Sequence, residues 1–193
     1  MKRIFDIALS IIMIIILTVP MAIVALAIKL TSRGPVLYWS ERIGRHKDVF
    51  LMPKFRTMKI DTPPVATHLL EDPRKYQTHF GRFLRKFSLD ELPQLYSILK
   101  GDMTFVGPRP ALFNQHDLIE MRTKCGVQEL FPGLTGYAQV NGRDEISIPE
   151  KVKLDQYYLR NRSFILDIKI LWLTVFKVLR SEDINLGNYG KDS

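Results

Sequence analysis

Two adjacent carboxylates, Asp90 and Glu91, are the residues of this sequence best suited to chemistry. They precede the apolar positions of a short helix, so they would lie in its first turn. There, unpaired backbone N–H groups and the positive helix end favour the ionised form. Arg85 and Lys86 stand just upstream and add positive charge. Such a carboxylate can attack phosphorus or hold Mg²⁺, although acidic residues also serve commonly as simple helix caps.

A helix over residues 88–101 is expected to position this pair. Ser88 and Glu91 fit a capping box, and Gly101 is a suitable C-terminal cap. Pro93 must distort the first turn or shift its start, because proline lacks an N–H and crowds the preceding turn.

Two glycine-punctuated segments, 101–110 and 132–143, present one arginine each, Arg109 and Arg143. Glycine lets backbone approach a ligand closely, and an arginine fork suits bidentate phosphate binding. Tight structural turns would explain the same glycines equally well. Neither segment matches a dinucleotide fingerprint or a P-loop. The four histidines show no paired metal-ligand spacing, which argues against zinc.

The positive charge is concentrated in one window. The net charge is +8, and residues 29–59 hold eight basic and two acidic residues, most of that excess. An anionic partner is therefore expected, either nucleic acid, phospholipid or a phosphorylated substrate. Residues 36–39 and 49–58 predict a β-hairpin that places Lys54 and Arg56 on one face. That face is either a binding site or a solvated strand edge.

Length and composition limit the architecture. A chain of 193 residues suits one domain with a real core, and an apolar fraction of 46% excludes wholesale disorder. The single cysteine excludes an internal disulfide framework and fits a reducing compartment.

Residues 7–28 form a run of 22 residues without a charge. At about 1.5 Å per residue, a helix of this length just crosses a bilayer core. A cleaved signal peptide is disfavoured, because its apolar region runs only about 7–15 residues. A single membrane span and a bent helix that re-enters one leaflet both stay open. Pro20 and the basic residues on both flanks favour the second, but proline is tolerated in true spans.

Residues 164–180 predict a strongly amphipathic helix, with Asp167, Thr174 and Lys177 along one side. Such a helix either packs on the core or lies in a membrane interface.

Short motifs follow one another in order from residue 2 to about residue 180. They are Lys2-Arg3-Ile4-Phe5-Asp6, Lys54-Phe55-Arg56-Thr57-Met58, Ser88-Leu89-Asp90-Glu91-Leu92-Pro93-Gln94-Leu95, Gly101-Asp102-Met103, Gly107-Pro108-Arg109-Pro110, Pro132-Gly133-Leu134-Thr135-Gly136, Gln139-Val140-Asn141-Gly142-Arg143 and Asp155-Gln156-Tyr157-Tyr158. This ordered set resembles the bacterial monotopic polyprenyl-phosphate phosphoglycosyl transferases, the sugar transferases that initiate glycan assembly on a lipid carrier.

The resemblance implies an α+β fold, mainly helical, with a small β-hairpin and amphipathic interfacial helices. Residues 1–34 would form a re-entrant membrane helix hairpin, and residues 35–193 a cytoplasmic catalytic domain packed on the bacterial inner membrane. The family breaks its membrane helix at a Ser-Pro pair. Here Val19 precedes Pro20, so the hydroxyl that would re-satisfy the freed backbone is missing. Pro53 also stands where the family usually has an aromatic residue.

The implied activity is transfer of phospho-sugar from a UDP-sugar to polyprenyl phosphate, giving polyprenyl-diphosphate-sugar and UMP. By similarity, Asp90 is the nucleophile of a ping-pong scheme with a covalent phospho-sugar intermediate. Mg²⁺ is expected at Asp90, and Glu91 is expected to support metal or proton chemistry. The short chain looks more like the transferases for modified N-acetyl sugars.

The remaining implied site residues bind phosphate or substrate. They are Lys54, Arg56, Arg85, Arg109, Gln139, Asn141, Arg143 and the further carboxylate Asp155. The expected partners are the UDP-sugar, polyprenyl phosphate and the phospholipid membrane, without nucleic acid; a homodimer is compatible with the sequence. Two other functions stay open, a membrane-anchored nucleotide-sugar hydrolase and a non-catalytic membrane-surface binding module.

Overall fold

The computed structural model describes residues 1–63, 72–142 and 146–180. The elements are α1 (Lys2–Thr31), β1 (Leu37–Ile43), the 3-10 helix η1 (Arg45–Lys47), β2 (Val49–Phe55), α2 (Pro73–Tyr76), α3 (His79–Lys86), the 3-10 helix η3 (Leu89–Gln94), α4 (Leu95–Lys100), β3 (Thr104–Val106), α5 (His116–Lys124), the 3-10 helix η4 (Val127–Glu129), β4 (Gly133–Thr135), α6 (Tyr137–Asn141), α7 (Ile148–Asn161) and α8 (Phe164–Arg180). The fold is α+β and mainly helical, as the sequence predicts.

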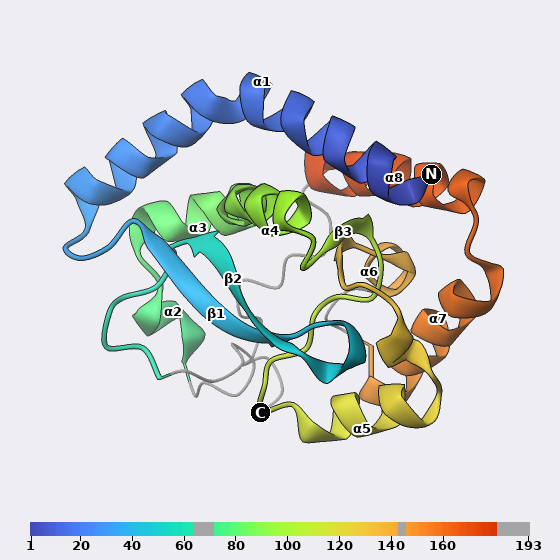
Figure 1. Cartoon of the computed structure of the whole chain (residues 1–193). Helices are drawn as coiled ribbons and strands as arrows, with labels where there is room; N and C mark the ends of the chain where they lie inside the picture. The colour runs from blue at the N-terminus through green and yellow to red at the C-terminus, as the bar shows by residue number, and fades with distance from the viewer. Residues whose placement is uncertain (64–71, 143–145, 181–193) are drawn as a thin grey trace.

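The long helix α1 arches over one face of the molecule, with α8 beside its N-terminal part (Figure 1). Its first half packs on the main core through Leu9 and Met13, and its second half packs on a smaller cluster around Phe55 and Leu84. A break into two helices was expected at Pro20. The structure instead has one helix that continues through Pro20 and curves (Figure 1).

Both ends of α1 are bonded to the rest of the structure. Near the start, Asp6 accepts a hydrogen bond of 2.6 Å from the Thr104 hydroxyl, and Lys2 lies 2.7 Å from the Asp167 carboxylate. Just beyond the far end, Arg56 donates to the carbonyl group of Ser32. Both ends of α1 are therefore held against the same folded domain. Among the described residues, α1 is the one helix long and apolar enough to cross a membrane, judged by length and composition.

The helix α8 has its polar side turned inward. Asp167 is buried and accepts a hydrogen bond from Tyr158, and Thr174 lies 2.7 Å from the Thr135 hydroxyl. Ile170 of α8 is buried in the main core, but many other apolar side chains of α8 and those of the outer face of α1 are exposed. They are Ile4, Ile11, Ile12, Ile15, Ile16, Val19, Ile23, Leu26, Leu30, Phe164, Ile165, Ile168, Trp172, Leu173, Val175 and Phe176.

The predicted β-hairpin is confirmed. Strands β1 and β2 pair antiparallel from Leu37 opposite Phe55 to Ile43 opposite Val49. Pro53 is tolerated because the sheet has two strands, and each therefore keeps one edge free of ladder bonds. Phe50 and Met52 of β2 enter the main core, which leaves Lys54 near the end of the hairpin.

The glycines of the two punctuated segments bring backbone against backbone. Strands β3 and β4 pair in parallel, and Gly107 donates its N–H to the Thr135 carbonyl at 2.9 Å. A Cβ atom on Gly133 or Gly136 would collide with the backbone of Gly107. These glycines thus allow close packing between the two segments, a structural role that differs from both expected ones, approach to a ligand and a tight turn within one segment.

Candidate active site

The carboxylate pair lies in the 3-10 helix η3, and the capping box predicted over Ser88 and Glu91 is wrong. Ser88 has a left-handed backbone (φ 54°) and its side chain caps no N–H group. Pro93 lies inside η3, which continues directly into α4, and the expected cap Gly101 ends that helix with φ 104°. The Glu91 carboxylate is directed away from Ser88, toward two cations.

Glu91 joins three chain segments. Its Oε1 atom accepts hydrogen bonds from Arg109 Nη2 at 2.5 Å and from Lys54 Nζ at 3.3 Å, and its Oε2 atom lies 3.4 Å from Arg109 Nη1. Lys54 comes from β2, and Arg109 comes from the segment after β3. The side chains of Lys54 and Glu91 are only 15% and 16% exposed. Paired charges this well buried interact more strongly than a surface ion pair.

Asp90 is buried, with 7% of its surface exposed. The charges of Lys54, Arg85 and Arg109 all act on it. Within the described ranges, no hydrogen bond is found to the Asp90 carboxylate. Asp90 therefore has an uncommitted carboxylate among cations, whereas Glu91 is occupied by them.

The pKa values of the two carboxyl groups are shifted in opposite directions. Burial, followed by the negative charge of Glu91, raises the pKa of Asp90 despite the cations around it. Burial also opposes ionisation of Glu91, but Arg109 and Lys54 outweigh it and hold the pKa of Glu91 far below its usual range. The position of Asp90 in the first turn was expected to favour its ionised form. This expectation is wrong for the structure without bound substrate, because burial and the charge of Glu91 raise the pKa of Asp90 more than its surroundings lower it.

The pKa values of two neighbouring cations, Lys54 and Arg42, are lowered. Burial is the main cause that lowers the pKa of Lys54 to about 8; Glu91 counteracts it, and Arg109 and Arg42 add to it. Arg42 has a pKa lowered to about 10, first by burial and then by Arg109. Like charges held this close favour an anion between them.

Arg42 is a site residue that the sequence analysis missed. It lies on β1, where it donates to the Ser40 hydroxyl at 3.0 Å and to the Pro110 carbonyl at 3.1 Å. The available signal was strand alternation, since Ser40 and Arg42 share the face opposite the exposed Glu41.

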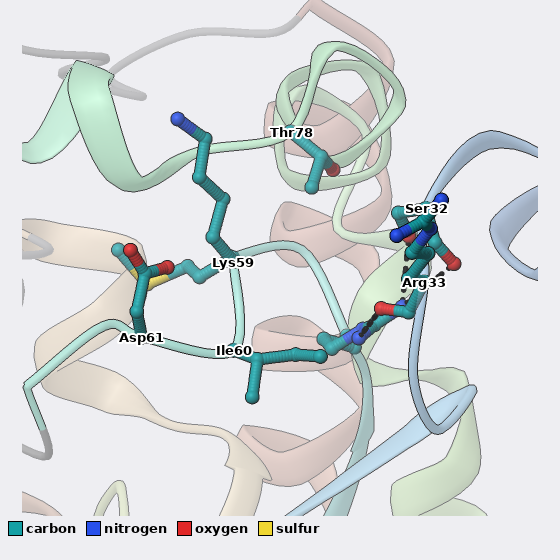
Figure 2. A pocket seen from close by; sticks show the side chains of 8 residues that line it. Ser32, Arg33, Lys59, Ile60, Asp61 and Thr78 are labelled. Carbon is teal, nitrogen blue, oxygen red and sulfur yellow. Dashed lines mark hydrogen bonds between the residues drawn. The ribbon is translucent and has the colours of Figure 1, made fainter.

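Arg56 does not bond to Glu91 as Lys54 does. Its guanidinium donates to the carbonyl groups of Ser32 and Arg33, just after α1. There it lines an open pocket of about 350 Å³ together with Lys59, Ile60, Asp61 and Thr78 (Figure 2). The structure therefore does not bring Arg56 to the carboxylate pair.

The other expected binding residues also lie apart from the pair. Gln139 donates to the Leu134 carbonyl at 3.1 Å, and Asn141 donates to the Tyr137 carbonyl at 2.7 Å. Arg143 lies outside the described residues.

Asp155 is buried in an ion pair. It accepts two hydrogen bonds from Arg122, at 2.7 and 3.0 Å, and both side chains are almost fully enclosed. Burial raises the pKa of Asp155, and Arg122 counteracts the rise. Asp155 is thus linked to Glu91 through two residues, Arg122 and Arg109, because Arg122 also donates to the Arg109 carbonyl at 2.8 Å.

A metal would find few protein ligands here. Over the described ranges, no group of three His, Cys, Asp or Glu side chains could hold an ion. Mg²⁺ commonly uses one or two carboxylates and completes its coordination with water and substrate phosphates. The uncommitted carboxylate of Asp90 fits that use, and Glu91, bonded to Arg109 and Lys54, does not.

A carboxylate pair set among Lys54, Arg42, Arg85 and Arg109 is the arrangement expected of an enzyme that acts on phosphorylated substrates. The chain belongs to the bacterial sugar transferase family, whose model matches residues 1–181. The family resemblance drawn from the order of the motifs is therefore confirmed.

Curated relatives agree with this assignment. The chain is 41% identical over 189 residues to the uncharacterized sugar transferase EpsL of Bacillus subtilis, covering 98% of this chain and 92% of that protein. It is 40% identical over 186 residues to the UDP-glucose:undecaprenyl-phosphate glucose-1-phosphate transferase of Escherichia coli, with 92% of this chain and 40% of that protein covered. For the undecaprenyl-phosphate galactose phosphotransferase of Salmonella typhimurium, identity is 37% over 203 residues, and coverage is 94% and 41%. The chain thus spans about two fifths of the length of these last two relatives.

Proposed function

We propose that the protein transfers a sugar phosphate from a UDP-sugar to polyprenyl phosphate, giving polyprenyl-diphosphate-sugar and UMP. The observation that carries the proposal is the uncommitted, buried Asp90 beside the Glu91–Arg109–Lys54 cluster. The names of the Escherichia coli and Salmonella relatives support the same reaction class. A modified N-acetyl sugar is the proposed donor sugar.

The proposed reaction has two displacement steps. A carboxylate oxygen of Asp90 attacks the phosphorus that carries the sugar, a new O–P bond forms, and the bond from that phosphorus to UMP breaks. A phosphate oxygen of polyprenyl phosphate then attacks the same phosphorus and releases the Asp90 carboxylate. The absence of a hydrogen bond to the Asp90 carboxylate within the described ranges supports this role, since at least one of its oxygens must be free to attack.

The cations around the pair would hold the diphosphate in line for attack. Phosphoryl transfer depends on positioning and charge neutralisation more than on other covalent chemistry. Glu91 would orient Arg109 and Lys54 through its hydrogen bonds. Bound at Asp90, Mg²⁺ would supply further neutralisation of the diphosphate oxygens.

We further propose that α1 enters one leaflet of the bacterial inner membrane and returns, with the catalytic residues on the cytoplasmic side. The bonds of Lys2 and Asp6 at one end of α1, and of Arg56 beyond the other end, support this topology because they tie both ends to one body. The exposed apolar side of α8 supports contact with the same membrane.

The test is release of UMP from a panel of UDP-sugars, including glucose, galactose and modified N-acetyl sugars, with and without polyprenyl phosphate. We expect continuous release only with the lipid, and one equivalent or less without it. Sustained sugar-phosphate release without lipid would identify a hydrolase. Salt-sensitive binding with no UMP release would identify a non-catalytic module.

Lys54 should set an alkaline limit on activity. Its pKa of about 8 means that the folded enzyme loses this positive charge as the pH rises through 8, so phosphate binding weakens above it. We expect kcat/KM for the UDP-sugar to fall about 10-fold between pH 7.5 and 9. The Lys54→Arg variant keeps its charge at these pH values and should show no such fall. A parallel decline in both enzymes would assign the limit to another group.

A further inference from the structure

The segment that carries Arg109 has little structure of its own. Residues 107–112 form no helix, and their one bridge joins Leu112 to Arg42. Pro108 and Pro110 flank Arg109, and each fixes its own φ angle and lacks an N–H donor. Pro110 also restricts the backbone of Arg109 to extended conformations. The segment is therefore stiff, but its place in the structure depends on the groups that bind it.

One of these groups is Arg122, on α5. Arg122 donates through Nη1 to the Arg109 carbonyl at 2.8 Å and through Nε and Nη2 to one oxygen of Asp155. The side chains of Arg122 and Asp155 are 3% and 2% exposed. Such a buried ion pair is weak evidence for stability, because removing two charges from water offsets most of the attraction between them. A role in orientation explains its presence better.

The second group is Arg42, on the hairpin. It donates to the carbonyl of Pro110, the residue directly after Arg109, and the backbone N–H of Ile43 donates to the Ala111 carbonyl at 2.9 Å. The carbonyl groups of three consecutive residues, 109–111, are thus each held by a donor from another element.

We propose that Arg122, oriented by Asp155, and Arg42 are positioning residues that fix residues 109–111 and so aim the Arg109 side chain at Glu91. This assigns Asp155 an indirect part in the reaction, through Arg122, in place of contact with substrate. The inference rests on the proposed function for its kinetic test, and one arm of the experiment below is independent of turnover.

The kinetic arm is a double-mutant cycle with UDP-glucose, or whichever UDP-sugar the enzyme turns over. Asp155→Asn should lower kcat/KM about 10- to 100-fold, the effect of a misplaced catalytic group. In the Arg109→Ala background the same change should cost less than about 3-fold, because the group it positions is already gone. A full additional loss in that background would overturn the proposal.

Conservative variants keep the test open if Asp155→Asn folds poorly. Arg122→Lys and Arg42→Lys keep the charge but lose the fixed fork, so each should show the same coupling to Arg109. The matched control is Glu120→Gln, which breaks an exposed ion pair with Lys124 on the same helix as Arg122 and should leave kcat/KM unchanged.

The second arm measures backbone hydrogen exchange. The four backbone amides of residues 107–112, those of Gly107, Arg109, Ala111 and Leu112, should exchange about 10-fold faster in Arg122→Lys and Asp155→Asn, while α7 and β2 keep their protection. The control Glu120→Gln should match the parent protein. Unchanged exchange in residues 107–112 would overturn the positioning role even in a protein that turns over no UDP-sugar. Failure to release UMP from any UDP-sugar would count against the proposed function alone.

Discussion

The Asp90→Asn variant is expected to lose at least about 10³-fold of its UMP release and to form no covalent phospho-sugar adduct. Asparagine has nearly the same shape as aspartate, but its amide is not a nucleophile toward phosphorus. Because no hydrogen bond to Asp90 is found within the described ranges, the change should leave the fold intact. The measurements are UMP release, intact-protein mass after incubation with UDP-sugar, and thermal unfolding.

The matched control for this variant is Asp117→Asn. Asp117 is also an acidic residue in the first turn of a helix, but it is exposed on α5. The control should keep full activity and the adduct. Normal turnover by Asp90→Asn, or formation of the adduct in the same yield as in the parent protein, would refute the covalent mechanism.

The second large effect concerns topology. A small tag at residue 1 is expected to be inaccessible to a membrane-impermeant reagent in intact cells, and fully labelled after the membrane is opened. The reason is that Lys2 bonds to Asp167 and Asp6 to Thr104, which belong to the same body as the carboxylate pair. A helix that carried its start across the bilayer would have to break these bonds.

The control for the topology experiment is the same tag fused to a protein with a known outward-facing N-terminus. Labelling of the tag on this protein from outside intact cells would establish a single membrane span. That result would leave the mechanism of transfer untouched.

Local patterns in the sequence predicted the local structure well. The hairpin followed from β-prone runs around a turn, and α8 was predicted with the bounds found, because its periodicity extends over the whole helix. Gly101 was predicted as a cap because the residue that ends a helix often needs a left-handed backbone, which glycine adopts without strain. The helix and the cap depend on neighbours within a few positions, and the hairpin depends on two consecutive runs joined by one turn.

The site could be predicted only in part, because its geometry depends on distant residues. The capping box failed since Glu91 gains more from Arg109, 18 positions away, and from Lys54 than from the Ser88 backbone. The pairing of Arg122 with Asp155 joins positions 33 apart and has no local signal. Family motifs therefore pointed to residues such as Asp155 without indicating what each side chain touches.

Because Asp167 and Thr174 of α8 face the core, the protein exposes apolar side chains, and this exposure affects how its stability is measured in solution. The exposed apolar side chains of α8 and α1 form a surface that amphiphiles are expected to bind, so lipid or detergent would act as a ligand of the folded state. By mass action, a ligand of the folded state raises the free energy of unfolding with the logarithm of its free concentration. The melting temperature of this protein is thus a property of the protein together with its amphiphile, and variants are comparable only in the same amphiphile at the same concentration.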